Sequence, residues 1–421
     1  MIRIFKFNQK ISVKMPIFIS VGILSIISLF VLNYIAEHKV QKHLIMIILG
    51  SSLFFLIQFI RLRFFHEKIN LIYFSMLILM CLPFTQPEIR GAKNWFLFFQ
   101  PSEPSKLIIV MALAKFLSDN KKRINDLYPI LISGLIILLP VLILVAQKDV
   151  GTALIYLSIL MPMLYWSGLN SFYIFLFFSP ILSLYVNMIG NVYAHNVWEG
   201  NFPFIALIVW IFIILIVLMR LFLRSNNFNF NKYLYLFLTI VLNIGASFVS
   251  EKSWNYLTQD EAVEFSHLKT RIESFISPSH DVRGSGWQVN QSMMAIGAGG
   301  LFGGEANQVK LKFLPDADTD FIISSIAESF GFLTILLIIS IYLFLLYWLL
   351  NYAQKSRSNF LSLLVIGYLT ILLAHIFITL GMAVSLAPVT GVPAPFLSYG
   401  GSFTLTCFAM LGICNNISNN I

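Results

Sequence analysis

The chain has 421 residues, of which 58% are hydrophobic and 11% are charged, whereas soluble domains hold roughly 45–50% apolar and about 25% charged residues. This composition excludes a soluble protein. The net charge is +9, but the basic residues stand between apolar runs, which argues against a nucleic-acid-binding surface and indicates charged loops between membrane spans.

The first apolar run, from Pro16 to Ile35, follows four basic residues. It is longer than the core of a signal peptide and lacks a clear small-residue cleavage site, so we expect a retained first span. Further runs of about 20 apolar residues, the length that crosses a bilayer, continue to the C-terminus. The predicted spans are residues 16–35, 43–60, 70–86, 104–118, 128–146, 151–168, 170–189, 202–223, 232–250, 321–351, 359–387 and 398–416.

The basic residues also predict the orientation of these twelve spans. Alternating spans place 16 of the 28 Lys and Arg residues on the side of the N-terminus, and six of the other twelve lie in one long segment, residues 250–320. The positive-inside rule therefore puts both termini in the cytoplasm. We expect an all-α polytopic membrane protein that forms a single domain over residues 1–421, with residues 250–320 outside.

Three polar clusters in the predicted outer loops add polar groups at membrane depth, where ionisable groups cost roughly 2.5–3.5 kcal/mol on insertion scales and so indicate function. They are residues 90–106, 147–153 and 391–402. All three lie on the face of the 250–320 segment, and we expect them to converge on one cavity. For Glu103 and Lys106, the spacing of three residues leaves an alternative, in which the two side chains merely pair with each other on a helix.

Residues 250–320 carry 10 of the 19 acidic residues and are the expected place for chemistry. Apolar residues at helical spacing predict an amphipathic helix at the interface, which ends before Pro278. The turn that follows presents Asp281 and Arg283 on a backbone with little side-chain cover, where a large ligand can approach closely.

Seven of the 23 glycines lie between Gly284 and Gly304. A nucleotide loop is rejected, because the sixth position of a GxGxxG frame from Gly297 is Phe302 and no GxxxxGK[ST] motif exists. No nucleotide or organic cofactor is therefore expected, and a flexible surface loop remains the plain alternative. The three cysteines have no CxxC spacing and predict neither a disulfide framework nor a metal site.

Six ordered stretches resemble the SEDS family of polytopic cell-wall glycosyltransferases, the family of RodA, FtsW and SpoVE. The stretches are residues 91–95, 100–103, 147–153, 291–300, 314–328 and 395–402. Family members commonly have ten spans, so the resemblance implies an inserted helix pair within residues 190–250. The chain departs from the family pattern at Asn94, Lys148, Val282, Asp318 and Ser329.

The resemblance implies that the chain polymerises lipid II into glycan strands, using a large loop outside the bacterial cytoplasmic (inner) membrane. Asp281 is the residue at the position of the family's essential aspartate. A carboxylate there can accept the proton of an attacking sugar hydroxyl, and cationic groups or a divalent cation (Mg or Mn) can stabilise the departing pyrophosphate. The substrate-binding candidates are Lys93, Trp95, Glu103, Lys106, Arg283, Gln288, Gln291, Ser292, Asp320, Ser398 and Tyr399.

The implied partners are lipid II, the growing glycan strand and a class B penicillin-binding protein, a transpeptidase that crosslinks the strands. Residues 308–315 are more similar to the RodA version than to the division-specific FtsW version, which favours a role in cell elongation and rod shape. Three alternatives remain: an FtsW-type polymerase, a flippase of a lipid-linked precursor and a non-catalytic scaffold. A structural pairing of Arg283 with a neighbouring acid is an alternative to its substrate role.

Overall fold

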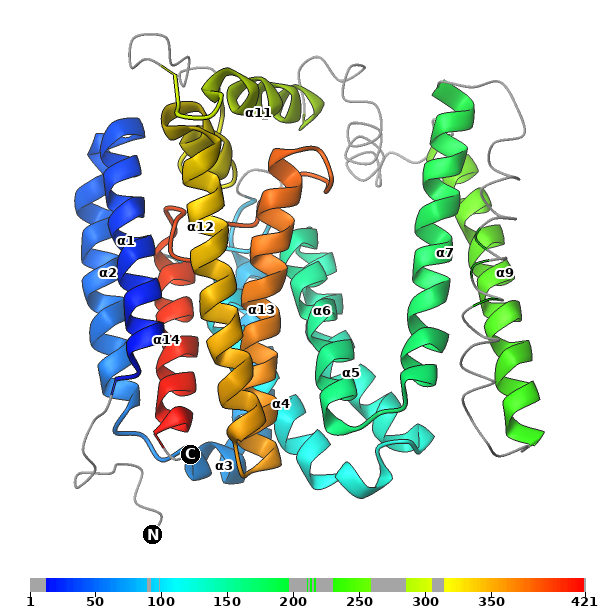
Figure 1. Cartoon of the computed structure of the whole chain (residues 1–421). Helices are drawn as coiled ribbons and strands as arrows, with labels where there is room; N and C mark the ends of the chain where they lie inside the picture. Colours follow the sequence, from blue (N-terminus) through cyan, green and yellow to red (C-terminus); the bar gives the residue numbers. More distant parts are fainter. Residues whose placement is uncertain are drawn as a thin grey trace. The chain divides into compact units, whose positions relative to one another are not determined.

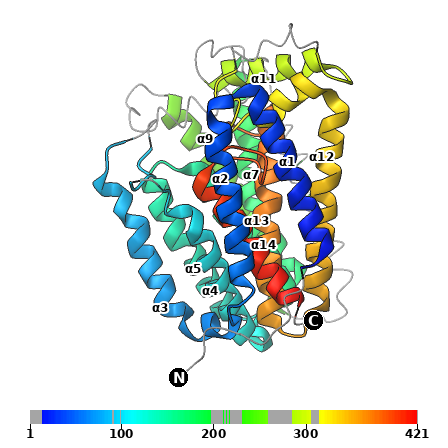
Figure 2. The same ribbon diagram turned by 90° about the vertical axis from the view of Figure 1, so that its left-hand side faces the viewer.

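The computed structural model describes residues 13–88, 92–97, 99–196, 230–258, 285–304 and 314–419, together with three positions between 210 and 216. The described elements are α-helices, with two short 3₁₀ turns and one isolated bridge between Phe96 and Phe99. Figures 1 and 2 show the long helices running side by side within each compact unit. Their bounds are α1 (Met15–Ile35), α2 (Glu37–Ile57), α3 (Leu62–Cys81), η1 (Leu82–Thr85), α4 (Ser102–Asp119), η2 (Lys121–Arg123), α5 (Leu127–Ala146), α6 (Val150–Ser167), α7 (Ser171–Asn196), α9 (Phe230–Thr258), α11 (Ser285–Gly299), α12 (Ile322–Lys355), α13 (Asn359–Ala383) and α14 (Gly401–Ser418).

Seven of the described helices are long and apolar enough to cross a membrane, where a helix satisfies its own backbone hydrogen bonds. The all-helical, polytopic prediction is confirmed. Some bounds differ: α2 and α3 begin at Glu37 and Leu62, six and eight residues before the predicted starts, because their charged first turns lack the apolar signal. The predicted span 202–223, apart from the three positions between 210 and 216, and the interfacial helix before Pro278 lie outside the described residues.

Contacts divide the chain into two compact units, Met1–Gly168 with Gln291–Ile421, and Leu169–Asn290. In the first unit, α14 packs against α2, α4, α12 and α13, and nearly all of its side chains are buried. Helix α13 packs against α4, α6 and α12. These central helices place α4, α6, α13 and α14 around one buried region, which holds most of the polar side chains discussed below.

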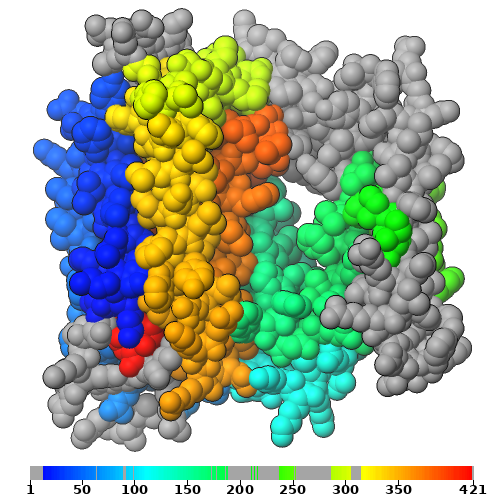
Figure 3. All heavy atoms as spheres, in the orientation of Figure 1, coloured from blue at the N-terminus to red at the C-terminus, as the bar shows by residue number. Residues whose placement is uncertain are grey.

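Helix α12 is interrupted at Gly331, whose backbone (φ 79°, ψ 176°) is not helical. The chain after α11 docks on this break through backbone hydrogen bonds. Phe332 N–H donates to Gly300 O at 2.9 Å, Leu333 N–H to Leu301 O at 3.2 Å, and Gly304 N–H to Glu328 O at 3.0 Å. We name this contact between residues 299–304 and 327–333 the backbone clasp; Figure 3 shows α11 lying across the end of α12.

The backbone clasp explains why this stretch is rich in glycine. A Cβ atom at Gly299 would collide with Ala327 O, and one at Gly303 would collide with Ser329 O. Gly303 and Gly331 also have positive φ angles of 99° and 79°, which favour glycine. Three of these glycines therefore permit close backbone packing, which differs from the flexible loop considered as the plain alternative.

The second unit contains α7 and α9, which pack against each other through a ladder of small polar side chains. Ser183 Oγ lies 3.1 Å from Ser247 Oγ, Asn187 Nδ2 donates to Ser247 Oγ at 2.9 Å, and Asn243 Nδ2 donates to Ser179 Oγ at 2.9 Å. Such hydrogen bonds associate helices where lipid removes the hydrophobic drive. Helix α9 lies largely within the predicted inserted pair, and the insertion itself stays a prediction.

Candidate active site

The first turn of α4 holds a buried ion pair. Lys106 Nζ donates to Glu103 Oε1 at 2.8 Å and to Oε2 at 2.9 Å, and the two side chains are 0% and 5% exposed. Pro101 and Pro104 stand at the start of this helix, where proline is tolerated, and an acid is favoured near a helix N-terminus. The pairing anticipated from their spacing is present; a role toward substrate stays a prediction.

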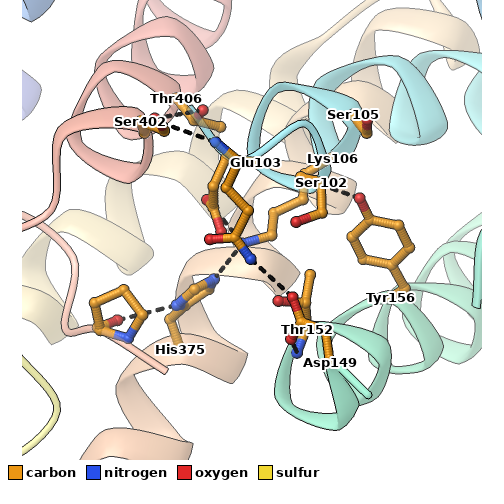
Figure 4. Close-up of polar contacts among 12 residues, drawn as sticks. Ser102, Glu103, Ser105, Lys106, Asp149, Thr152, Tyr156, His375, Ser402 and Thr406 are labelled. Carbon is orange, nitrogen blue, oxygen red and sulfur yellow. Dashed lines mark hydrogen bonds and ion pairs between the residues drawn. The ribbon is translucent and has the colours of Figure 1, made fainter. Parts of the chain in front are cut away.

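His375 of α13 completes this pair, as Figure 4 shows. Its Nε2 lies 3.1 Å from Lys106 Nζ, and its Nδ1 lies 3.0 Å from the Pro393 carbonyl oxygen. An ammonium group only donates and a carbonyl only accepts, so Nδ1 carries the proton and Nε2 accepts. The imidazole stacks on Phe403 with ring centroids 4.4 Å apart. We name Glu103, Lys106 and His375 the Lys106 cluster.

Asp149 forms a second polar centre at the N-cap of α6. Its Oδ1 accepts from Thr152 N–H at 3.2 Å, and its Oδ2 accepts from Gln100 Nε2 at 2.7 Å and from Asn94 Nδ2 at 3.1 Å. Next to it, Lys93 N–H donates to Gln147 O at 2.9 Å. The clusters at 90–106 and 147–153 are therefore brought together, as their shared face predicted.

Ser398 and Tyr399 lie in the connection that precedes α14, where the sequence had placed the start of the last span. Ser398 Oγ donates to Thr319 O at 2.6 Å, and Tyr399 N–H donates to Asp318 O at 2.9 Å. Asp318 also accepts from Lys39 Nζ at 2.5 Å. These bonds join residues 391–402 to the 314–320 segment, so both residues serve as connections between elements.

The remaining candidates are distributed over other elements. Gln288, Gln291 and Ser292 lie on α11, and Ser292 Oγ donates to Ala383 O at 2.7 Å and lies 2.6 Å from Ser324 Oγ. Trp95 is 38% exposed, and Asp320 is half-buried beside Gly391. Asp281 and Arg283 lie outside the described residues, so their placement in the site stays a prediction.

Two features were missed from the sequence. His375 was not among the candidates, although a lone histidine within an apolar span is a signal of function. Helix α11 was not predicted, although Ser292, Ala295 and Gly299, which are all buried, recur at helical spacing. The described residues contain no group of three His, Cys, Asp or Glu side chains placed to hold a metal ion, and the divalent cation stays a prediction.

This fold and this buried polar region define a class: a multi-pass, all-helical membrane protein with a charged cluster enclosed among its central helices. The family model described as cell cycle protein, that of FtsW, RodA and SpoVE, matches residues 8–200 and 208–421. The chain belongs to this family.

Individual relatives carry both RodA and FtsW names. The chain is 26% identical over 351 residues to the probable peptidoglycan glycosyltransferase FtsW of Trichlorobacter lovleyi, covering 82% of this chain and 73% of the relative. It is 26% identical over 428 residues to the peptidoglycan glycosyltransferase RodA of Treponema pallidum, covering 95% and 94%. With the peptidoglycan glycosyltransferase MrdB of Helicobacter pylori, the identity is 28% and the coverage is 88% and 80%.

Solved structures share the fold. A chain from a structure of a peptidoglycan synthase complex superposes with a TM-score of 0.68 at 21% identity, covering 98% of this chain and 99% of that one. The crystal structure of the rod shape determining protein RodA from Thermus thermophilus gives a TM-score of 0.60 at 20% identity, with 97% of each chain covered. At these identities the likeness concerns the fold alone.

Proposed function

We propose that this chain polymerises lipid II into glycan strands at the outer face of the cytoplasmic membrane. It is a peptidoglycan glycosyltransferase, the activity of its relatives in Treponema pallidum and Helicobacter pylori. The observation that carries the proposal is the convergence of the buried side chains Glu103, Lys106 and Asp149 with the half-buried Gln100 in the first unit. Buried ionisable groups among spans are costly and mark functional sites.

The chemistry needs a base and an anion site. In the proposed step, the 4-hydroxyl oxygen of one sugar forms a bond to the anomeric carbon of a second, lipid-linked disaccharide. The bond from that carbon to undecaprenyl pyrophosphate breaks with inversion, and Asp281 accepts the hydroxyl proton. Lys93 and Arg283 are the proposed contacts for the pyrophosphate.

The buried Lys106 cluster supports the proposed substrate contacts without touching the substrate itself. Because Lys106 has no exposed surface, we assign it to holding the start of α4 in place and to adding positive potential beneath the donor. Glu103 and His375 fix the direction of its ammonium group. A flippase would instead need binding residues near the bilayer midplane with access from both sides, whereas this pair lies in the first turn of α4, at its proposed outer end.

We further propose that the chain serves cell elongation and works with a class B penicillin-binding protein. The RodA-like sequence of residues 308–315 supports the role in elongation. Its structural neighbour comes from a synthase complex that coordinates polymerization and crosslinking, which supports a transpeptidase partner. In this proposal both termini lie in the cytoplasm, and a divalent cation aids the departure of the pyrophosphate.

The test supplies the purified protein and its partner with lipid II and Mg²⁺ or Mn²⁺ and measures glycan strands. We expect strands from the wild type and none above background from Asp281→Asn. Asp260→Asn, which removes an acid from the same segment outside the motif, is the control and is expected to stay active. Equal polymerisation by Asp281→Asn would refute the catalytic assignment. Precursor translocation in vesicles without any polymerisation would favour the flippase.

A further inference from the structure

A cavity of about 210 Å³ lies where α4 and α6 end and where the α12–α13 connection turns. Its polar lining includes Lys121, Trp166, Gln354, Ser356, Asn359 and Ser362. In Figure 1 this end of the first unit is opposite to the end that carries α11. The proposed site chemistry therefore does not use this cavity.

Hydrogen bonds hold several side chains around the cavity in place. Lys121 Nζ donates to Asn359 Oδ1 at 2.8 Å. Trp166 Nε1 donates to Ser362 Oγ at 2.7 Å, and Ser362 Oγ donates to Ala353 O at 2.7 Å. None of the described lining residues is an acid, and none of the described acids lies within ion-pair distance of Lys121. The ammonium charge at this cavity is therefore not neutralised by the described chain.

The surroundings favour an anion at the membrane surface. Lys122, Lys355 and Arg357 are exposed neighbours of lining residues in the sequence. The first turn of α13 lines the cavity, and its N-cap residue, Ser358, makes no side-chain hydrogen bond, which leaves N–H groups of that turn available. Tyr165 is 58% exposed beside Trp166, and aromatic residues of this kind gather at the membrane–water interface.

We propose that this cavity binds a phosphate group, supplied by an anionic phospholipid of the adjoining leaflet or by soluble phosphate. Lys121 supplies the charge, while Gln354 and the first turn of α13 supply hydrogen-bond donors. Basic pockets between spans on the cytoplasmic side are suited to anionic headgroups, and the basic loops here place this end in the cytoplasm. A bound phosphate would link η2 to the α12–α13 turn.

The experiment removes lipid from the protein in neutral detergent and measures binding by native mass spectrometry. The three probes are short-chain phosphatidylglycerol, short-chain phosphatidylcholine and inorganic phosphate. We expect one saturable phosphatidylglycerol and an affinity about fivefold lower for Lys121→Gln, the effect of one basic group near a membrane surface. Gln354→Glu, which places a carboxylate in the lining, should weaken binding at least as much.

Lys68→Gln is the matched control, because it removes an exposed charge from the second turn of α3, predicted to lie on the same face and absent from the cavity lining. It should bind as the wild type does. Binding of phosphatidylglycerol but not phosphatidylcholine identifies the lipid as the source. Binding of inorganic phosphate with the same dependence on Lys121 identifies the soluble source, and both results support the site. Unchanged binding by Lys121→Gln, or equal loss in Lys68→Gln, overturns the proposal.

Discussion

At the scale of single residues, the Lys106 cluster combines a structural and a chemical role. An ammonium and a carboxylate that are removed from water lose hydration, and each compensates the other only while both are present. Lys106 is also 5.3 Å from the ring of Phe403, which adds a weak attraction for the cation. The pair therefore keeps charge inside the protein at a tolerable cost.

Removing one partner should be far worse than removing both. Lys106→Met leaves Glu103 buried without its cation, and we expect the stability to fall by about 3–5 kcal/mol. The double variant Glu103→Gln with Lys106→Met should recover most of this loss. Thermal unfolding of the purified proteins in one detergent measures both effects.

The same double variant separates the two roles. If the pair only stabilises the fold, the double variant polymerises lipid II at the wild-type rate. If Lys106 also supplies positive potential beneath the lipid-linked donor, the rate of polymerisation falls at least tenfold although the stability returns. A tenfold loss corresponds to about 1.4 kcal/mol, the scale of one lost electrostatic group. Full activity with restored stability would contradict the role assigned to Lys106.

Sequence spacing predicted only the local half of this cluster. Glu103 and Lys106 are three residues apart, so helix geometry alone makes them neighbours. His375 is separated from Lys106 by 269 positions, and its approach depends on how α4 and α13 pack. His375 stands in an apolar stretch of the sequence. The spacing of residues in that stretch does not indicate which side chain His375 contacts.

At the scale of elements, the backbone clasp shows what a glycine-rich sequence can mean. The glycine content of residues 284–304 left a flexible surface loop as an alternative, whereas 285–299 form α11 and the glycines after Ala298 contact α12. Close packing between two backbones produces no pattern of apolar and polar side chains in the sequence, because it requires glycine, which has no Cβ atom. The interruption of α12 was equally hidden, because Gly331 lies inside the predicted span 321–351 and a single glycine there does not by itself end a helix.

Two neighbouring glycines test the clasp. Gly299→Ala places a methyl group against the Ala327 carbonyl, and we expect a loss of about 1–3 kcal/mol together with reduced polymerisation. Gly297→Ala meets nothing within 4 Å and should be neutral or slightly stabilising, because alanine favours helix. Thermal unfolding and strand synthesis are measured on both variants. Equal behaviour of the two would show that the clasp contributes little.

At the scale of the whole molecule, composition and hydropathy predicted the architecture well. The membrane class, the helical fold and most span positions follow from apolar length, because the bilayer imposes it. Span starts were less well predicted where charged residues form the first turn, as in α2 and α3. The division into two compact units depends on packing between helices, which hydropathy does not contain.

Orientation is testable with single exposed cysteines, because the other two native cysteines, Cys407 and Cys414, are buried. In a Cys81→Ser background, which removes the exposed native thiol, Lys148→Cys should react with a membrane-impermeant maleimide added to intact cells. Lys122→Cys, also at an exposed position, should react only after the membrane is permeabilised. Labelling is read by a mass shift on a gel. The opposite pattern would invert the proposed topology and place residues 250–320 inside.

The protonation state of His375 has a further consequence for energised membranes. Its imidazole is neutral because Nδ1–H is held by the Pro393 carbonyl and Nε2 accepts from Lys106, so the Lys106 cluster carries no net charge. A membrane potential acts on net charge, at about 2.3 kcal/mol per elementary charge per 100 mV. The membrane potential therefore exerts no net force on the Lys106 cluster as a whole.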